Sequence, residues 1–410
     1  MTGDPVLEIA SIAAGGAGVA RHEGLVVFVP RTAPGDRVVA RISQRGRFAT
    51  GTVLAMQQEG ADRVIPPCRH YTRDRCGGCQ LQHLSYGAQL LAKQGIVSDA
   101  FARVARRPTT VEPVEPSTKE WRYRRKLTLA MRSTGEGWIA GLHPYDDPIG
   151  VFDLHDCPIT DERVIDVWRA VLDASGFLPR AEMLRVAVRL TDHAASLTVE
   201  GGIRWGGEES ASLLRAVPAL ESIWWTPPRG VRREVATRGS AHAAGASFVQ
   251  VNAGVANTLR EHVHAIVARV GPSTVIDAYA GDGATAVRIA LGGARVIAIE
   301  ADPDAAAECA RLLPDGSRAI AALVEDAIAE SLPADLVVLN PPRAGVHERV
   351  TAALSADPPS AIIYVSCDPA TLARDVGRLP GFRIASVRPF DMFPQTAHVE
   401  TVCELVRDAA

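Results

Sequence analysis

Residues 241–410 carry short apolar runs at wide, regular intervals, and this pattern constrains the fold more than any other feature. The runs cover residues 274–277, 295–300, 335–340, 361–366, 382–390 and 399–406. The first four lie about 20 to 40 residues apart, which leaves room for a helix between consecutive strands. Strands that alternate with helices build a mostly parallel sheet with helices on both faces. Residues 241–410 therefore predict a doubly wound α/β domain of Rossmann-like type.

Residues 1–57 show a different pattern, of short strands separated by Gly and Pro turns. The apolar segments cover residues 6–12, 25–29, 37–42 and 48–56. Closely spaced strands of this kind predict a small β-barrel of the oligonucleotide-binding type. Arg41, Arg45 and Arg47 cluster at its last turn. We expect them to contact nucleic-acid phosphates, although a solvated basic loop would have the same composition.

Residues 58–240 predict a mixed α+β region. Residues 85–107 have a helical pattern, and alternating apolar residues at 185–199 indicate strands. Between them, residues 119–126 interleave aromatic and basic side chains, and Arg132 follows. This segment suits phosphate contact with base stacking, or equally an exposed strand with arginines on one face.

The bulk properties exclude some classes of protein. A net charge of -3 excludes a globally basic nucleic-acid binder, so any such contact needs a local patch. The first residues lack the basic and apolar regions of a signal peptide, and no apolar run is long enough for a membrane span. We therefore expect a cytoplasmic protein with no obligate protein partner. In that compartment cysteines serve metal binding, catalysis or burial rather than disulfides.

A glycine turn follows the first apolar run. Gly281-Asp282-Gly283 comes directly after the strand expected at 274–277. Glycines let a ligand approach the backbone, but Ala286 stands where a dinucleotide fingerprint has its third glycine. Glu300 ends the next strand, where a carboxylate can accept from ribose hydroxyls. With Asn340 at the end of the run at 335–340, the pattern favours S-adenosylmethionine, and NAD or a nucleotide-free domain is the alternative.

Cys367 directly follows the apolar run at 361–366. A thiol at the carboxyl end of a strand in an open α/β sheet lies where ligands bind. A lone cysteine after an apolar strand is nevertheless more often a small buried side chain than a nucleophile. A nucleophilic thiol here would need a base, and Glu400 on the last strand is the candidate, with Asp391 and His398 as weaker alternatives.

Four further cysteines form a candidate metal site. Cys68, Cys76 and Cys79 lie close together in the sequence, and Cys157 follows at a distance. Four thiolates with a Cys-x-x-Cys core suit zinc or an iron–sulfur cluster. Competing zinc ligands nearby are His70, His83 and His155. The residue types alone leave both metals open.

In combination, these motifs resemble those of the RNA 5-methyluridine methyltransferases, and especially the bacterial branch that methylates uracil carbon 5 in 23S rRNA. The resemblance runs nearly end to end. It implies a TRAM domain at 1–57, a central domain with iron–sulfur cysteines at 58–240 and a class I methyltransferase domain at 241–410. It also implies an RNA substrate, S-adenosylmethionine as methyl donor and a [4Fe-4S] cluster. The implied cluster ligands are Cys68, Cys76, Cys79 and Cys157.

The resemblance assigns roles to individual residues as well. Cys367 matches the nucleophile, and Glu400 matches the base that removes a proton. The implied cofactor contacts are Gln250 in the segment 248–252, Tyr279, Glu300 and Asn340. In this chemistry the thiolate adds to uracil carbon 6, carbon 5 takes the methyl group, the base removes the carbon 5 proton and the thiol is expelled. The target uridine must first leave its stack.

The chain departs from the family pattern at three points. Asn340 stands where an Asp is usual; it keeps hydrogen-bonding capacity without charge, so we expect a ligand contact rather than a base. Asp368 replaces the usual Asn after the nucleophile, and its charge would disfavour a thiolate if it pointed toward Cys367. The gap between Cys68 and Cys76 is also slightly longer than usual.

Several alternatives share part of this pattern. A tRNA uracil-5 methyltransferase would use the same catalytic residues, although the barrel and the four cysteines favour 23S rRNA. An adenine amino methyltransferase needs an aromatic residue where Arg343 stands. An RNA cytosine-5 methyltransferase would carry a Pro-Cys motif in the Asn340 loop. A non-catalytic RNA-binding protein would not be expected to keep both Cys367 and Glu400.

Overall fold

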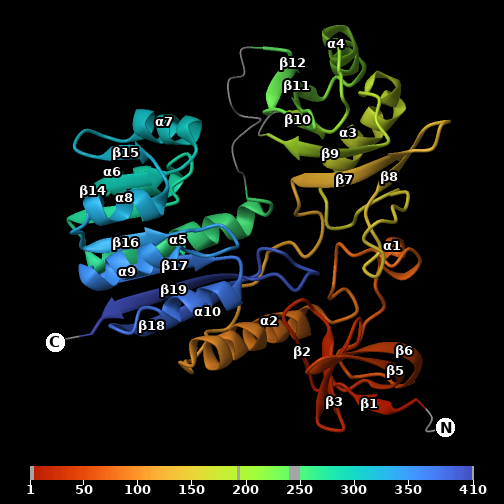
Figure 1. Ribbon diagram of the computed structural model, residues 1–410, viewed down its shortest axis with the longest axis horizontal. Helices are drawn as coiled ribbons and strands as arrows, with labels where there is room; N and C mark the ends of the chain where they lie inside the picture. The colour runs from red at the N-terminus through yellow and green to blue at the C-terminus, as the bar shows by residue number, and fades with distance from the viewer. Residues whose placement is uncertain (1–3, 192–193, 240–249, 409–410) are drawn as a thin grey trace.

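The computed structural model describes residues 4–191, 194–239 and 250–408, and three sheets organise them (Figure 1). The sheet nearest the C-terminus has seven strands in the order β15-β14-β13-β16-β17-β19-β18. Its strands are β13 (Thr274–Ala278), β14 (Arg295–Glu300), β15 (Arg318–Ala321), β16 (Leu336–Leu339), β17 (Ala361–Ser366), β18 (Phe382–Phe390) and β19 (Glu400–Arg407). All neighbouring pairs are parallel except those of β19, which runs antiparallel to both β17 and β18.

Helices cover both faces of this sheet. They are α5 (Ala253–Val270), α6 (Ala284–Leu291), α7 (Pro303–Leu312), α8 (Val324–Ser331), α9 (Glu348–Ala356) and α10 (Pro369–Gly377). Residues of α5 and α6 pack into one apolar core, and residues of α8, α9 and α10 pack into another. The central strands β16 and β17 are buried on both faces, because one core covers one face of the sheet and the other core covers the opposite face. The predicted doubly wound α/β fold is confirmed.

The N-terminal sheet has six strands in the order β1-β5-β6-β4-β3-β2. They are β1 (Val6–Glu8), β2 (Ser11–Ile12), β3 (Gly18–His22), β4 (Leu25–Val29), β5 (Arg37–Arg45) and β6 (Phe48–Gln58). The run expected at 6–12 is split into β1 and β2, because the chain changes partner from β5 to β3 between them. Whether the sheet closes as a barrel stays a prediction.

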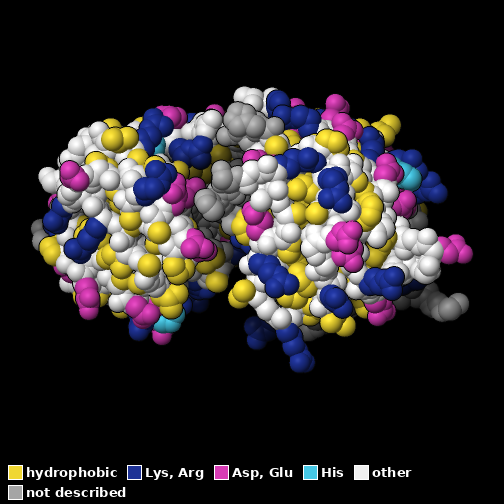
Figure 2. Space-filling model, turned by 90° about the horizontal axis from the view of Figure 1, so that it is seen from above, with side chains coloured by type: hydrophobic (Ala, Val, Ile, Leu, Met, Phe, Trp, Pro, Cys, Tyr) yellow, Lys and Arg dark blue, Asp and Glu magenta, His cyan; other side chains and the backbone are white. Residues whose placement is uncertain are grey.

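The third sheet also has six strands, in the order β12-β11-β10-β9-β7-β8. They are β7 (Lys126–Ser133), β8 (Trp138–Gly141), β9 (Met183–Leu190), β10 (Ala195–Glu200), β11 (Leu220–Thr226) and β12 (Arg233–Thr237). Two helices, α3 (Glu162–Asp173) and α4 (Gly207–Ala216), pack on it around a core that contains Trp168 and Leu213, and the short 3-10 helix η2 (Ser175–Phe177) follows α3. On the surface seen in Figure 2, positive and negative side chains are interspersed, in keeping with the small net charge.

Between the N-terminal and C-terminal sheets lies α2 (Tyr86–Ala100), which continues into the π-helical turn η1 (Phe101–Ala105) and follows the short α1 (Arg69–Thr72) (Figure 1). Val97, Phe101 and Ala105 are buried in the core of the seven-stranded sheet. This helix belongs in sequence to the predicted central region of residues 58–240, but it packs on the C-terminal sheet. The predicted boundary near residue 240 lies outside the described residues.

The segment at 119–126 is largely irregular and is not the exposed strand that its alternation suggested; only its last residue enters β7. The Arg122 guanidinium binds both oxygens of Asp156 at 2.8 Å. Tyr123 is buried, and its hydroxyl donates to the carbonyl of Pro394 at 3.0 Å. The prediction that this segment stacks on bases is therefore wrong for Tyr123, because its ring is packed in the protein interior. No helix in the described ranges is long and apolar enough to cross a membrane.

Candidate active site

The sheet topology brings Cys367 and Glu400 together. Ser366, the last residue of β17, pairs with Thr401 of the antiparallel strand β19. Continuing this register by one step places Cys367 opposite Glu400, the first residue of β19. The Cys367 side chain is half-buried, whereas Glu400 is only 6% exposed. Two residues that lie 33 positions apart in the sequence thus meet at one edge of the sheet.

Arg343 lies beside both side chains. Its guanidinium is close enough to the Cys367 thiol and the Glu400 carboxyl to lower the pKa of both. Burial and the nearby Glu400 raise the pKa of Cys367, and Arg343 opposes that shift. Burial raises the pKa of Glu400 to about 7, again against the effect of Arg343. The sequence analysis used Arg343 only to exclude an adenine site, although its place after β16, beside β17, was a signal for a role at this edge.

The loop that carries Arg343 is anchored by α10. Asp375 is fully buried, and its Oδ2 accepts from the Val346 amide at 3.0 Å and from the Tyr364 hydroxyl at 2.8 Å. The Arg374 guanidinium donates to the carbonyl of Ala344 at 2.8 Å. These contacts fix the backbone on the carboxyl-terminal side of Arg343.

Asp368 has a local structural role. It is the N-cap of α10, and its Oδ1 accepts from the amides of Ala370 at 2.9 Å and Thr371 at 3.0 Å. Asp is among the best N-cap residues, because its carboxylate satisfies amides that have no partner within the helix. The carboxylate is thus held at the start of the helix rather than against the Cys367 sulfur.

The expected cofactor residues lie along the same edge. Tyr279 follows β13, Glu300 ends β14 and Asn340 follows β16. The carboxyl ends of parallel strands form the usual ligand crevice of such sheets. Asn340 is exposed, whereas Tyr279 and Glu300 are half-buried. Gln250 is half-buried at the first described position after residue 249, and residues 248 and 249 of its motif lie outside the described residues.

The glycine turn is shaped by Glu300 and by left-handed backbone. One oxygen of Glu300 accepts from the Gly281 amide at 2.8 Å, and the other accepts from the Asp302 amide at 2.8 Å. Tyr279 adopts a φ of 65°, which is strained for an aromatic residue and typical of functional loops. A Cβ built on Gly281 would meet no atom within 4 Å, so the turn leaves open space in front of the backbone.

The four cysteines of the candidate metal site are neighbours. Cys68 and Cys79 belong to one small buried cluster, and the partly buried Cys157 packs against it. Burial, with a smaller effect of Cys157 and Cys68, raises the pKa of Cys76 to about 12, and the Gly78 amide, which donates to its sulfur at 3.4 Å, opposes the shift. Within the described ranges, however, no group of three or more His, Cys, Asp or Glu side chains is arranged to hold a metal ion. The sulfurs are thus gathered but do not form a coordination shell.

The nearby histidines have other partners. His70 Nδ1 contacts Asp74 Oδ2 at 2.7 Å, and its Nε2 accepts from the His155 amide at 3.2 Å. His83 Nδ1 contacts the Tyr71 hydroxyl at 2.7 Å. His70 and the Nδ1 atom of His83 are therefore engaged, which favours thiols over these atoms as ligands.

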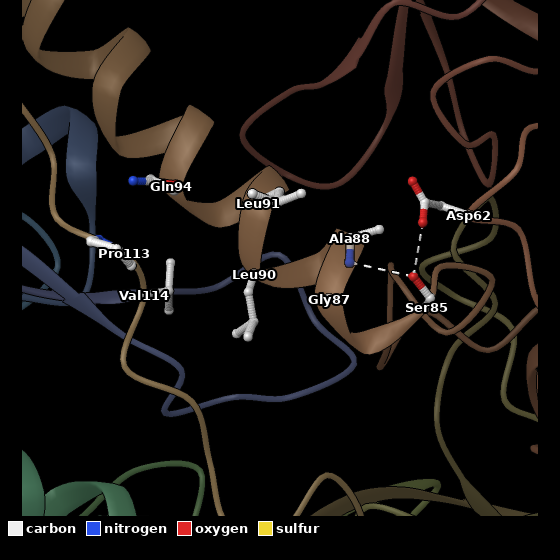
Figure 3. Close-up of a pocket in the computed structure, with 9 residues that line it drawn as sticks. All are labelled: Asp62, Ser85, Gly87, Ala88, Leu90, Leu91, Gln94, Pro113 and Val114. Atoms are coloured by element: carbon white, nitrogen blue, oxygen red, sulfur yellow. Dashed lines mark hydrogen bonds between the residues drawn. The ribbon is translucent and has the colours of Figure 1, made fainter.

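A pocket of about 450 Å³ lies along the first half of α2, away from these residues (Figure 3). At one end, Ser85 Oγ donates to Asp62 at 3.2 Å and accepts from the Ala88 amide at 3.4 Å. Leu90, Leu91 and Gln94 line it from the helix. None of the candidate site residues lines this pocket.

Comparison with known proteins identifies the family. The family model for tRNA (uracil-5-)-methyltransferase matches residues 305–408. A 23S rRNA (uracil(1939)-C(5))-methyltransferase RlmD of Chromohalobacter salexigens is 32% identical and covers 98% of this chain and 89% of its own length. The chain belongs to the RNA uracil-5 methyltransferase family. An uncharacterized RNA methyltransferase of Halalkalibacterium halodurans is also 32% identical, over 95% of this chain and 94% of its own.

A solved structure shares the fold of this chain. The Pyrococcus abyssi tRNA (uracil-54, C5)-methyltransferase, in complex with S-adenosyl-L-homocysteine, aligns with a TM-score of 0.71. The alignment covers 98% of this chain and 99% of that one, at 22% identity. At this identity the likeness shows a shared fold, including the N-terminal and central sheets that the family model does not reach.

Proposed function

We propose that the protein methylates carbon 5 of a uridine in 23S rRNA, with Cys367 as nucleophile and Glu400 as base. The observation that carries the proposal is the antiparallel register that sets Cys367 opposite Glu400, with Arg343 beside both. Methylation at carbon 5 requires a nucleophile and a proton acceptor in one pocket. The pair supplies both from a single edge of the sheet.

The residues of the chain account for each step. Cys367 reacts as a thiolate, which the Arg343 guanidinium stabilises against burial and the negative charge of Glu400. The sulfur bonds to uracil carbon 6, and the electron pair of the double bond makes carbon 5 nucleophilic. After methyl transfer, the Glu400 carboxylate takes the carbon 5 proton, the double bond reforms and the thiolate leaves. A carboxyl whose pKa is raised to about 7 is a better proton acceptor than an ordinary one.

S-adenosylmethionine, which would supply an electrophilic methyl group, fits the glycine turn. The Glu300 oxygens are held by backbone amides at the strand end, where they can also accept from ribose hydroxyls. The open space before Gly281 lets a ligand approach the backbone. Gln250, Tyr279 and Asn340 are the further contacts that we propose on this side of Cys367.

Two variants test the chemistry. Cys367→Ala should transfer no methyl group from tritiated S-adenosylmethionine to RNA and form no covalent adduct. Glu400→Gln should transfer the methyl group and then retain the RNA as an adduct on denaturing gels. His398→Gln is the matched control for the alternative base, and it should turn over without an adduct. Wild-type turnover by Cys367→Ala would refute the proposal.

The choice of 23S rRNA rests on the relatives. The bacterial relative named above carries a 23S rRNA methyltransferase name at 32% identity, whereas the tRNA-modifying neighbour is only 22% identical. The exposed Arg41 and Arg47 beside Phe48 give the N-terminal sheet a basic and aromatic edge for RNA. Mapping 5-methyluridine in rRNA and tRNA from a deletion strain tests this choice. Loss of 5-methyluridine from tRNA alone would favour the tRNA alternative.

We also propose that Cys68, Cys76, Cys79 and Cys157 hold a [4Fe-4S] cluster. The gathering of Cys68, Cys79 and Cys157 and the engagement of both His70 nitrogens support a thiol-only ligand set. Anaerobically purified protein should contain iron and sulfide and absorb visible light. Cys79→Ser should lose the iron, whereas the buried Cys309→Ser, outside the set, should retain it. Stoichiometric zinc without iron would overturn this assignment.

A further inference from the structure

The segment 391–399, which directly precedes Glu400, is irregular yet deeply buried. Asp391 and Met392 are fully buried, and Gln395 and Thr396 are 2% exposed. Gln395 also has a φ of 70°, in the left-handed region that disfavours side chains. Irregular backbone in the interior needs polar partners from outside the segment, because it lacks the internal ladder of a helix or strand. Those partners determine where β19 begins.

A buried ion pair with α2 holds the first end of the segment. Lys93 and Asp391 are both fully buried, and the Lys93 ammonium contacts Asp391 Oδ1 and donates to the carbonyl of Phe393 at 3.0 Å. The Tyr86 hydroxyl donates to the other oxygen, Asp391 Oδ2, at 2.8 Å. Burial lowers the pKa of Lys93, and the charge of Asp391 opposes that shift. Buried ion pairs contribute little net stability because both charges lose their water, so this pair is better explained by the geometry that it imposes.

A second contact from the same face of α2 holds the middle of the segment. Gln89 lies one turn before Lys93, and its Nε2 donates to Gln395 Oε1 at 2.9 Å and to the carbonyl of Leu84 at 3.0 Å. Its Oε1 accepts from the Gln395 amide at 2.9 Å. The Gln89 amide group thus fixes both the side chain and the backbone of the residue with strained φ. Gln94, on another face of the helix, donates to the Val111 carbonyl at 2.8 Å and lines the pocket of Figure 3.

The cysteine-bearing loop closes the segment from a third side. The amides of Gln80 and Leu81, directly after Cys79, donate to the carbonyl of Gln395 at 3.2 and 3.0 Å. The Ala397 amide donates to Gln80 Oε1 at 3.3 Å. The carbonyl of Gln395 and the amides of Gln395 and Ala397 are therefore bound by groups that lie more than 300 positions earlier in the sequence.

We propose that Gln89 and Lys93 of α2 are positioning residues that fix the 391–399 segment and so orient the Glu400 carboxylate for removal of the carbon 5 proton. The pairing of β19 with β17 and β18 fixes the backbone on the carboxyl-terminal side of Glu400, the first residue of the strand. On the other side its backbone direction depends on the 391–399 segment. A base must lie within about 3 Å of its proton, and a shift of roughly 1 Å can slow a step about 100-fold. The inference rests on the proposed role of Glu400.

The two steps of the reaction separate positioning from folding. In single-turnover reactions with RNA and S-adenosylmethionine, Gln89→Leu should form the covalent adduct within about threefold of the wild-type rate. It should resolve the adduct about 10- to 100-fold more slowly. Lys93→Met/Asp391→Asn removes both charges together, avoids an unpaired buried carboxylate and should behave alike. Gln94→Leu removes a hydrogen bond that the same helix makes to the Val111 carbonyl and not to residues 391–399, so it is the matched control and should resolve the adduct at the wild-type rate.

A merely structural role predicts a different result. Partial unfolding would slow adduct formation and adduct resolution together, and that outcome would overturn the positioning role. Resolution at the wild-type rate in both Gln89→Leu and Lys93→Met/Asp391→Asn would overturn it as well. Added to Glu400→Gln, Gln89→Leu should slow resolution no further, because both changes affect one step. If Glu400→Gln alone accumulates no adduct, the role of Glu400 fails and this inference fails with it. If only the α2 variants fail to accumulate adduct, the role of Glu400 stands.

Discussion

The burial of Glu400 makes a prediction about stability that does not depend on RNA. Burial raises the pKa of this carboxyl from 4.5 to about 7, so the folded protein prefers the neutral form. The preference is fully present below pH 4.5 and is lost as the pH rises through about 7, where the folded state must carry a buried charge. A shift of about 2.5 units corresponds to about 3 kcal/mol at pH 8.5. At pH 4.5 the charge on Glu400 destabilises the folded state by less than about 1 kcal/mol.

Glu400→Gln replaces the charge with a neutral group of the same shape and should remove that penalty. We expect the unfolding transition of the seven-stranded sheet to rise by roughly 6–12 °C at pH 8.5, from about 2–4 °C per kcal/mol. Near pH 4.5 the two proteins should unfold at similar temperatures. Calorimetric scans across this range give the difference directly. Glu404→Gln, on the same strand, is the control, because it breaks an ion pair with Arg269 and should not stabilise the protein. A Glu400→Gln protein that is no more stable than wild type at pH 8.5 would refute the reasoning.

Three further predictions concern the surroundings of the site. Gly283→Ala should lower the unfolding temperature in scanning fluorimetry, because its Cβ would lie 2.5 Å from the Cys309 sulfur at a φ of 88°; a normal transition would contradict this. Glu300→Gln should weaken S-adenosylmethionine binding about tenfold or more by calorimetry, since it puts an amide donor where two carboxylate oxygens accept; equal affinity would remove Glu300 from the site. Arg343→Met should slow iodoacetamide alkylation of Cys367 near neutral pH, because the charge that favours the thiolate is lost; an unchanged pH profile, measured by mass spectrometry, would contradict it.

Six of the seven strands of the C-terminal sheet could be predicted because each is an apolar run in the sequence, whereas the edge strand β15 (Arg318–Ala321) was not predicted. Buried parallel strands such as β16 and β17 are continuous apolar runs, and the chain gives room for a helix between them. The prediction for the segment 119–126 was wrong because its structure depends on contacts with residues distant in the sequence. Alternating side chains indicate a strand only when a partner strand exists, and here Arg122 finds its partner in Asp156, 34 positions later. No local pattern contains that contact.

The candidate site divides in the same way. Cys367, Glu300 and Asn340 could be placed at one edge because each ends or follows a parallel strand. The contacts of Lys93 and Gln89 could not be foreseen, because a lysine and a glutamine on a helix ordinarily face solvent. Their burial follows from the docking of α2 against a segment about 300 positions away.

The pairing of Cys367 with Glu400 depends on a single topological feature. If β19 ran parallel to β17, its first residue would lie at the amino ends of the strands, a full strand length from Cys367. Its antiparallel insertion between β17 and β18 instead brings the start of β19 to the edge where β17 ends. The base therefore belongs at the first position of β19, and its orientation depends on the segment that enters the strand. This is why buried contacts are concentrated on residues 391–399, and why a change on α2 should affect proton removal before it affects the thiol.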